Sequence, residues 1–261
     1  SIGSGSNGVC VVHDSKQLES HLAVGPDEQV IQKFIHGPSY SLEIIGYPGN
    51  YSPLQVTELE VDPVFDCKRV IAPSGLSKKL TADFENIAIT TANALKLKGL
   101  MDVEVILDHD VLRVLEIDAR LPSQTPITVL TSTGINMLQL LAEQHFRPSH
   151  KTTGIPIAQR GVIYEHIRVD GSTLTVTGEH AMASAGTLHL EKDFFGADEA
   201  ITSRSNQQTD WVATLINSAE TRTEAWEKRE AAIAEIIRFY NLDTYRDCTP
   251  THHGVASNPY C

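Results

Sequence analysis

The sequence predicts a mixed α/β (α+β) protein in which antiparallel sheets are covered by packed helices. Residues 101–120 form two alternating apolar and polar runs, joined by a short polar turn near His109 and Asp110, a pattern typical of a β-hairpin. Residues 76–97 and 223–240 carry apolar side chains at helical spacing, which predicts two amphipathic helices. A length of 261 residues leaves room for one large or two ordinary domains with ample core.

The same periodicities predict the remaining elements in chain order. A short helix is expected over residues 13–22, with Ser15 as its cap, and another over 135–145. Residues 120–126 are expected to form an irregular polar loop, because their prolines do not fit a helix interior. After Asn241 a polar, poorly ordered tail is expected. The strands are expected at 9–12, 29–35, 40–47, 54–61, 65–71, 161–169, 173–180 and 186–190.

The predicted hairpin gathers four carboxylates on one face. A turn symmetric about Asp110 places Glu104 opposite Glu116, and the same register places Asp102 opposite Asp118. Like charges directly across a strand pair are destabilising, so a cation is expected between them, and hard oxygen ligands suit Mg²⁺ or Mn²⁺. Because Mg²⁺ usually completes its shell with water and substrate phosphates, the hairpin predicts a nucleotide-phosphate site. The pattern fits a solvated acidic face equally well. The apolar side chains of the other face are Val103, Val105, Leu107, Leu115 and Ile117.

Composition and charge exclude several classes of protein. A net charge of −12 argues against general binding to nucleic acid or to anionic membranes, which needs a basic surface. No apolar run reaches membrane-spanning length and no signal peptide is visible, so a soluble cytoplasmic protein is expected. The cysteines lack metal-type pair spacing and are expected to be reduced thiols; they are Cys10, Cys67, Cys248 and Cys261.

A glycine- and serine-rich loop opens the sequence. Loops of this kind present backbone N–H groups to phosphate because no side chain blocks the approach. The spacing is neither that of the dinucleotide fingerprint nor that of a Walker A loop. Since the loop starts abruptly, residues upstream are expected to be absent from this numbering. Its central residues are Ser4, Gly5, Ser6, Asn7 and Gly8.

Together these segments carry a resemblance to the ATP-grasp ligases over residues 1–145. Residues 32–43, the strand that carries Glu104, and residues 116–120 and 132–136 occur in the order found in that family. Within the family the sequence most resembles the PylC group of pyrrolysine-biosynthesis ligases. Glu104 and Glu116 match the first two acidic residues of the family motif. The third residue of the motif is Asn in most ATP-grasp ligases, whereas it is Asp118 here, as in the PylC-like members. The sequence segments that carry this closer resemblance are residues 41–43, 65–67, 98–104, 115–126 and 163–166.

The resemblance implies an ATP-grasp fold, with the nucleotide bound between two lobes, and a reaction. ATP-grasp ligases phosphorylate a carboxylate with Mg²⁺-ATP and let an amine attack the acyl-phosphate. PylC-like members join 3-methyl-D-ornithine, through its carboxylate, to the ε-amino group of L-lysine, so these amino acids are the expected partners. Two alternatives remain open. One is an ATP-grasp ligase with another substrate, such as a D-alanine-type dipeptide ligase or a biotin-carboxylase relative. The other is a non-catalytic ATP- or metal-binding module.

The resemblance also assigns roles to residues. Glu116 and Arg120 would act in catalysis, with Arg120 clamping the acyl-phosphate or a carboxylate; its alternative is a salt bridge to a neighbouring acid. Glu43 would bind a substrate ammonium, or else be a surface carboxylate. The glycine-rich loop would cover the phosphates. The expected metal ligands are Glu104, Glu116 and Asp118, and the expected adenine hinge is Gln32, Lys33 and Ile35. The expected substrate-binding residues are Ser41, Glu43, Asp66, Asp118, Arg120, Ser123, Gln124 and Thr125.

The resemblance divides the chain into four parts. Residues 1–35 would belong to a small lobe, incomplete at its start, and residues 36–150 to a large lobe with the metal-binding hairpin. Residues 151–245 would complete the large lobe, and 246–261 would be the tail. The N-terminal lobe of the family, and its lysine before the flap, are missing from these residues and are expected upstream or from another chain. His166 is expected to be a core or hinge histidine rather than a catalytic base.

Overall fold

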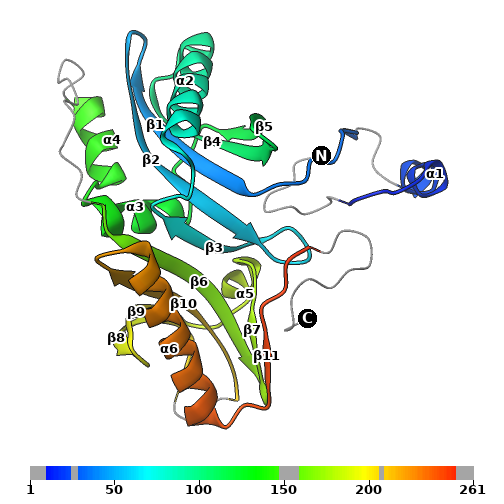
Figure 1. The fold of residues 1–261 in the computed structure, drawn as a ribbon, viewed down its shortest axis with the longest axis vertical. Coiled ribbons are helices and arrows are strands. Elements are labelled where there is room, and N and C mark those ends of the chain that lie inside the picture. The colour runs from blue at the N-terminus through cyan, green and yellow to red at the C-terminus, as the bar shows by residue number, and fades with distance from the viewer. Residues whose placement is uncertain (1–9, 25–28, 147–158, 206–208, 251–261) are drawn as a thin grey trace.

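A computed structural model describes residues 10–24, 29–146, 159–205 and 209–250 of this chain. The described strands form one 11-stranded sheet in the order β5-β4-β1-β2-β3-β6-β10-β9-β8, with β7 beside β6 and β11 beside β7 (Figure 1). Neighbouring strands are antiparallel except β7 and β11, which are parallel. The strands are β1 (Ser39–Tyr47), β2 (Asn50–Val61), β3 (Cys67–Ala72), β4 (Gly99–Asp108), β5 (Val111–Asp118), β6 (Gly161–Asp170), β7 (Thr173–Val176), β8 (His189–Phe194), β9 (Ala197–Thr202), β10 (Asp210–Ala219) and β11 (Thr244–Arg246).

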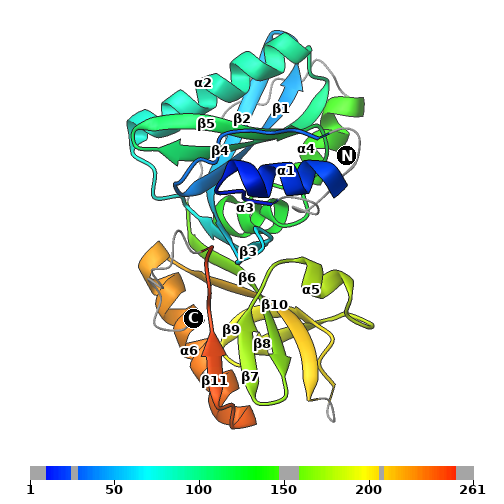
Figure 2. The same ribbon diagram turned by 90° about the vertical axis from the view of Figure 1, so that its right-hand side faces the viewer.

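Helices cover both faces of the sheet (Figures 1 and 2). Across the strands Tyr40 lies opposite Glu58, Glu58 opposite Ile71, and Ile71 opposite Ile163, so these residues share a face. Tyr40 belongs to the core under α2, and Ile163 packs on Ala225 of α6, so α2 and α6 cover this face. Helices α3 and α4 pack on the opposite face. The helices are α1 (Ser15–Val24), α2 (Lys78–Leu95), α3 (Thr125–Thr133), α4 (Met137–Phe146), α5 (His180–Ala183) and α6 (Arg222–Tyr240).

The acidic hairpin has the predicted cross-strand pairs. Glu104 lies opposite Glu116, and Asp102 lies opposite Asp118. The turn is nevertheless centred half a residue earlier than expected, because Asp108 pairs with Val111. A β-bulge, in which the pairing shifts between Glu104 and the next residue of β4, restores the register at the carboxylates. The bulge therefore decides which side chains face each other at the acidic end.

Capping explains where the two long helices begin. The Ser77 hydroxyl accepts a hydrogen bond from the backbone N–H of Leu80 at 3.3 Å, so α2 starts just after Ser77. Helix α6 has a complete capping box between Thr221 and Glu224. Helix α3 was not predicted. It begins at the end of the expected loop with a proline in its first turn, where the missing N–H costs nothing.

Several predicted elements are wrong. Among the described residues, neither 10–12 nor 29–35 forms a strand, and position 9 lies outside the described residues. Those segments have the composition of strands but are not among the strands of the described sheet, and a strand is stable only when other strands pair with it. Strands β9, β10 and β11 were not predicted. The segment expected to be a poorly ordered tail contains strand β11, and Cys248 is disulfide-bonded instead of being a free thiol.

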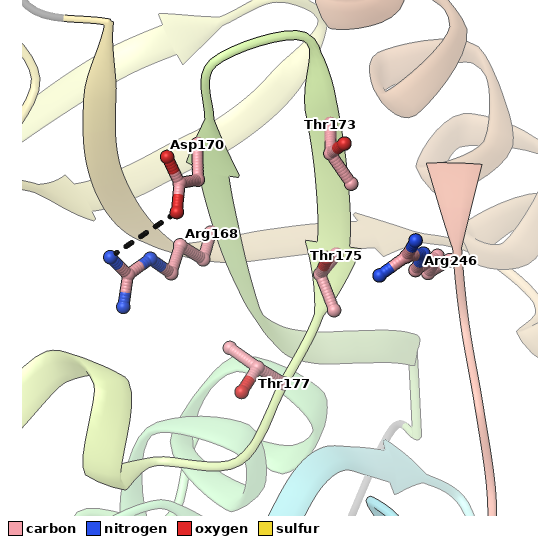
Figure 3. A pocket seen from close by; sticks show the side chains of 6 residues that line it. All are labelled: Arg168, Asp170, Thr173, Thr175, Thr177 and Arg246. Carbon is pink, nitrogen blue, oxygen red and sulfur yellow. Dashed lines mark ion pairs between the residues drawn. The ribbon is translucent and has the colours of Figure 1, made fainter. Parts of the chain in front are cut away.

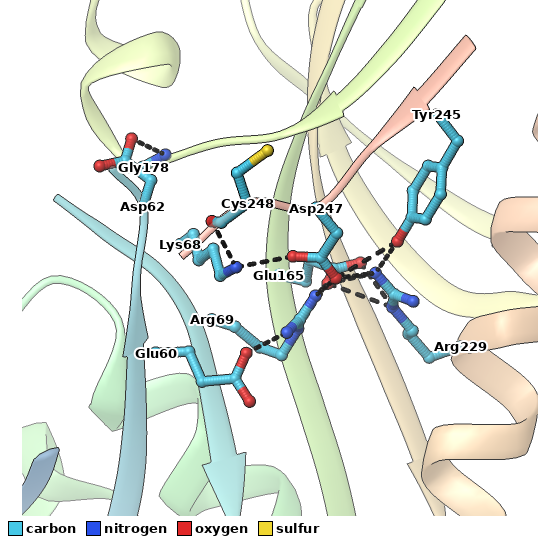
Figure 4. Close-up of polar contacts among 10 residues, drawn as sticks. All are labelled: Glu60, Asp62, Lys68, Arg69, Glu165, Gly178, Arg229, Tyr245, Asp247 and Cys248. Atoms are coloured by element: carbon cyan, nitrogen blue, oxygen red, sulfur yellow. Dashed lines mark hydrogen bonds and ion pairs between the residues drawn. The ribbon is translucent and has the colours of Figure 1, made fainter. Parts of the chain in front are cut away.

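A buried ionic cluster joins β3, β6, α6 and the segment after β11 (Figure 4). Glu165 of β6 has no exposed surface and accepts hydrogen bonds from Arg69 of β3 and, at 2.8 Å, from Arg229 of α6. Asp247 accepts hydrogen bonds from Lys68 Nζ at 2.7 Å and from Arg69 Nη2 at 2.6 Å. Charge and hydrogen bonding therefore fix the C-terminal segment against the centre of the sheet.

Acid should loosen this cluster through Asp247. Burial alone would raise the pKa of Asp247, but the nearby Arg69 and Lys68 lower it to about 2. An unfolded aspartate has a pKa of about 3.9. The stabilisation is thus complete above that value and lost as pH falls through about 2, a change of about 3 kcal/mol. Urea unfolding between pH 6 and pH 2.5 should show most of this loss in the wild type, and a smaller pH dependence in Asp247→Asn. An equal pH dependence in both proteins would contradict the assignment.

None of the described helices is long and apolar enough to cross a lipid bilayer.

Candidate active site

The hairpin carboxylates crowd one another. The pKa of Glu104 is raised to about 9 by burial and by repulsion from Asp102, Glu116 and Asp118. Burial, followed by repulsion from Asp118, also raises the pKa of Glu116. Without a cation, the Glu104 carboxyl group keeps a proton near neutral pH that an ordinary carboxyl group would have lost.

Strand β1 extends the acidic face toward α3. Ser41 lies opposite Glu104 on β4, and Glu43 lies opposite Asp102. The Ser41 hydroxyl donates a hydrogen bond to Asp102 Oδ1 at 2.6 Å. Asp102 is therefore buried beside β1, behind the more exposed Glu116.

Glu43 is a fully buried carboxylate. Its Oε1 accepts a hydrogen bond from the Thr125 hydroxyl at the start of α3, and Oε2 has no partner among the described residues. Burial and the neighbouring Asp102 raise the pKa of Glu43. The alternative that Glu43 is a surface carboxylate is wrong. A buried carboxylate oxygen without a partner fits a ligand that donates a hydrogen bond or carries positive charge.

The donor set suits a hard divalent cation. Within the described parts of the chain, no group of three or more His, Cys, Asp or Glu side chains is already arranged to hold a metal ion. The oxygen donors of Glu104, Glu116 and Asp118 nevertheless have the chemistry of a Mg²⁺ or Mn²⁺ site, and their mutual repulsion leaves a need for positive charge.

Arg120 lies at the open end of the hairpin. Its Nη2 contacts Asp118 Oδ2 at 2.7 Å, so the salt bridge considered as the alternative is present. The side chain of Arg120 remains 57% exposed, which leaves donors of its guanidinium accessible. An exposed pair of this kind adds little stability, so its presence does not compete with a ligand-binding role.

The loop before α3 meets a segment that the sequence analysis missed. Ser123 Oγ and Gln124 Nε2 donate hydrogen bonds to Glu179 Oε2 at 2.7 and 3.0 Å. Asp66 Oδ2 accepts a hydrogen bond from the backbone N–H of His180 at 2.9 Å and lies 2.8 Å from its Nδ1. The substrate-binding candidates Asp66, Ser123 and Gln124 are thus gathered by the short segment around α5.

One glycine provides a sequence signal for that segment. A side chain at Gly178 would place its Cβ 2.0 Å from the Asp66 carboxylate, so only glycine lets the two segments approach this closely. The backbone N–H of Glu179 also donates to the carbonyl of Cys67 at 3.1 Å. Nothing in the spacing of Glu179 and His180 marks them as site residues.

His166 lies on β6 and is buried, as expected for a core histidine. Its Nδ1 lies 2.8 Å from the Thr214 hydroxyl, and its ring meets Tyr164 edge to face. Burial lowers the pKa of His166 to about 4, which keeps the imidazole neutral at physiological pH.

The expected nucleotide contacts are only partly described. The glycine-rich loop at residues 4–8 lies outside the described residues. Gln32 and Lys33 are exposed and Ile35 is half-buried, in a segment without regular secondary structure. The adenine-hinge assignment of these residues therefore stays a prediction.

A cavity of about 380 Å³ lies beside the β6–β7 hairpin, away from the acidic hairpin (Figure 3). Its lining residues are Arg168, Asp170, Thr173, Thr175, Thr177 and Arg246. Another, of about 340 Å³, lies between β2 and the start of α2. Neither cavity includes any of the predicted site residues.

Comparison with known proteins defines the class. Residues 1–124 match the family model described as the ATP-grasp domain. The fold resembles a biotin carboxylase from Campylobacter jejuni, with a TM-score of 0.66 and 19% identity, over 89% of this chain and 55% of that one. It also resembles an L-amino acid ligase from Bacillus licheniformis, with a TM-score of 0.59 and 20% identity, over 88% and 60% of the two chains. The matched part of the chain, residues 1–124, belongs to the ATP-grasp family.

Within this family the chain is similar to 3-methyl-D-ornithine–L-lysine ligases. It is 34% identical to the ligase of Methanosarcina mazei over 181 residues, which are 69% of this chain and 46% of that protein. It is 33% identical to the ligase of Methanosarcina barkeri over 181 residues, which are 47% of that protein. The match therefore spans about half the length of these relatives.

Proposed function

We propose that this chain is part of a cytoplasmic, ATP- and Mg²⁺-dependent ligase that joins 3-methyl-D-ornithine to the ε-amino group of L-lysine in pyrrolysine biosynthesis. The observation that carries the proposal is the continuity of the acidic face. The buried, half-satisfied carboxylate of Glu43 lies directly beside the carboxylate hairpin. A cationic amino acid held at Glu43 would have its own carboxylate within reach of a phosphate-binding site.

We assign residues of this chain to the metal ion, to the acyl-phosphate and to the two lobes. Glu104, Glu116 and Asp118 would hold Mg²⁺ or Mn²⁺, which would supply positive charge to the phosphates of ATP. Arg120 would orient the acyl-phosphate through paired N–H donors. Residues 1–35 would contribute the small lobe, with the loop at 4–8 covering the phosphates, and residues 36–245 the large lobe.

The proposed chemistry has two steps. A carboxylate oxygen of 3-methyl-D-ornithine attacks the γ-phosphorus of ATP, and ADP leaves with the electrons of the broken P–O bond. The neutral ε-amine of L-lysine then attacks the acyl carbon, phosphate leaves, and the amine loses its proton as the amide forms. Ser41 and Glu43 would position the first substrate so that its carboxylate, and not an ammonium group, faces the phosphate.

The test is ADP release by the intact natural protein with Mg²⁺-ATP, 3-methyl-D-ornithine and L-lysine, together with mass detection of the product. Release that requires both amino acids and yields the amide would support the proposal. Release with a different amine or carboxylate would keep the ligase class and reject this substrate pair. ATP binding without release under any condition would favour a non-catalytic module.

Glu43→Gln should weaken binding of the amino-acid substrate without weakening binding of ATP. Removing the charge should raise the KM for 3-methyl-D-ornithine by about 10- to 100-fold, because a buried charge would lose its partner. The KM for ATP serves as the internal control and should change little. Steady-state kinetics with each substrate varied in turn measures both values. Equal increases in both KM values would contradict a substrate-binding role for Glu43.

A further inference from the structure

Two buried polar atoms next to the loop before α3 lack hydrogen-bond partners. Among the described residues, neither Gln124 Oε1 nor His166 Nε2 has one. Gln124 is 5% exposed and His166 is 3% exposed, so bulk water does not satisfy either side chain. A buried polar atom without a partner costs free energy, which a ligand can recover.

The other polar atom of each side chain is already engaged. Gln124 Nε2 donates to Glu179 Oε2 at 3.0 Å and to the carbonyl of Cys67 at 3.4 Å. His166 Nδ1 lies 2.8 Å from the Thr214 hydroxyl. These contacts hold the amide and the imidazole in place, so the unpartnered atoms present fixed acceptor positions.

Glu179 supplies negative charge near both side chains, since it accepts a hydrogen bond from Gln124 and interacts electrostatically with His166. Burial raises its pKa, but hydrogen bonds from Gln124 and Ser123 outweigh that effect, and His166 adds to the lowering. The carboxylate is therefore ionised at neutral pH. A neutral His166 that donates its Nδ1–H to Thr214 leaves a lone pair at Nε2. The cluster then consists of acceptors only, and its complement is a cation with several N–H donors.

We propose that Gln124, His166 and Glu179 form a second ammonium subsite, which takes the α-ammonium group of the amine-donating amino acid. This inference rests on the proposed function. Glu43 is proposed to bind 3-methyl-D-ornithine, so the α-ammonium group of the second amino acid needs a site of its own. An ammonium group has three donors and no acceptor, which matches the two unpartnered acceptors and the Glu179 carboxylate.

The first turn of α3 separates the two subsites. Thr125 contacts Glu43 on β1, whereas the preceding Gln124 contacts Glu179 beside α5. Glu43 lies beside Asp102 of the hairpin, so the amino acid whose carboxylate is phosphorylated takes that side. Lysine carries its ε-amine on a flexible four-carbon stem, which lets the α-ammonium bind away from the hairpin while the ε-amine approaches it.

The test compares two ligands in two proteins by calorimetry. The intact natural protein with Mg²⁺-ADP is titrated with L-lysine and with 6-aminohexanoate, which lacks the α-amino group. The wild type should bind L-lysine about tenfold or more tightly than 6-aminohexanoate. In Glu179→Gln this preference should fall to about one, because only the ligand with the α-ammonium group loses a contact. A structural defect alone would weaken both ligands alike.

Matched variants keep the result interpretable. Glu143→Gln makes the same chemical change at an exposed position of α4 and should keep the wild-type preference. Gln124→Ala removes an acceptor and one hydrogen bond to Glu179 but keeps the Glu179 carboxylate, and it should also reduce the preference, which covers the case that Glu179→Gln does not fold. An unchanged preference in the folded site variants would overturn the subsite, as would the absence of L-lysine binding to the wild type. Failure of turnover with intact L-lysine preference would count against the proposed function alone.

Discussion

Replacing Glu116 by glutamine should lower the kcat for ADP release by about 100- to 1000-fold while the fold survives. The change removes a proposed metal ligand and one negative charge from the crowded hairpin. Because repulsion and burial already raise the pKa of Glu116, losing the charge should not destabilise the metal-free protein. Steady-state kinetics at saturating Mg²⁺, together with thermal unfolding without metal, measures both effects.

Asp110→Asn is the matched control for that change. Asp110 is exposed in the turn of the same hairpin, and the substitution likewise removes one carboxylate charge. It should leave kcat close to the wild-type value. Full activity of Glu116→Gln at saturating Mg²⁺ would rule out its role as a metal ligand, and unfolding of the variant would contradict the view that the hairpin carboxylates repel each other.

Glu165→Gln should cost about 3–5 kcal/mol in the free energy of unfolding. Glu165 is fully buried between Arg69 and Arg229, so its loss leaves two buried guanidinium groups without their shared carboxylate. Chemical denaturation followed by circular dichroism measures the change. A loss below about 1 kcal/mol would show that the cluster relaxes or admits water.

The control for the buried cluster is an exposed pair of the same chemistry. Glu235 on α6 contacts Arg238 through two hydrogen bonds of 2.6 Å, at the surface. Glu235→Gln should change stability very little, because solvent screens an exposed pair. A similar loss in both variants would show that burial is not what makes Glu165 important.

The sequence was most informative where local pattern decided the structure. Alternation on β4 and β5 placed the four carboxylates on one face, and the paired positions Glu104 and Glu116 are confirmed. This pairing also depends on the β-bulge next to Glu104, which the sequence pattern did not predict. Helix periodicity similarly located α2 and α6 to within two residues at each end.

The sequence was least informative where the outcome depended on distant partners. Residues 29–35 have strand composition, yet a strand forms only when another strand pairs with it. Conversely, β11 was taken for a disordered tail because its order comes from pairing with β7 and from Asp247. Glu179 was missed for the same reason, since its partners Ser123 and Gln124 lie far away in the chain.

The ionic cluster has a consequence for how the chain matures. Lys68 and Asp247 are separated by 179 positions. The ammonium group of Lys68 on β3 therefore lacks its Asp247 partner until nearly all of the described chain has been synthesised. The early strands cannot reach their final electrostatic balance until residue 247 has left the ribosome, so completion of the sheet is a late event in the synthesis of this part of the chain. A nascent chain stalled before residue 247 would therefore expose basic, unfinished β-sheet, the kind of surface that chaperones and proteases recognise.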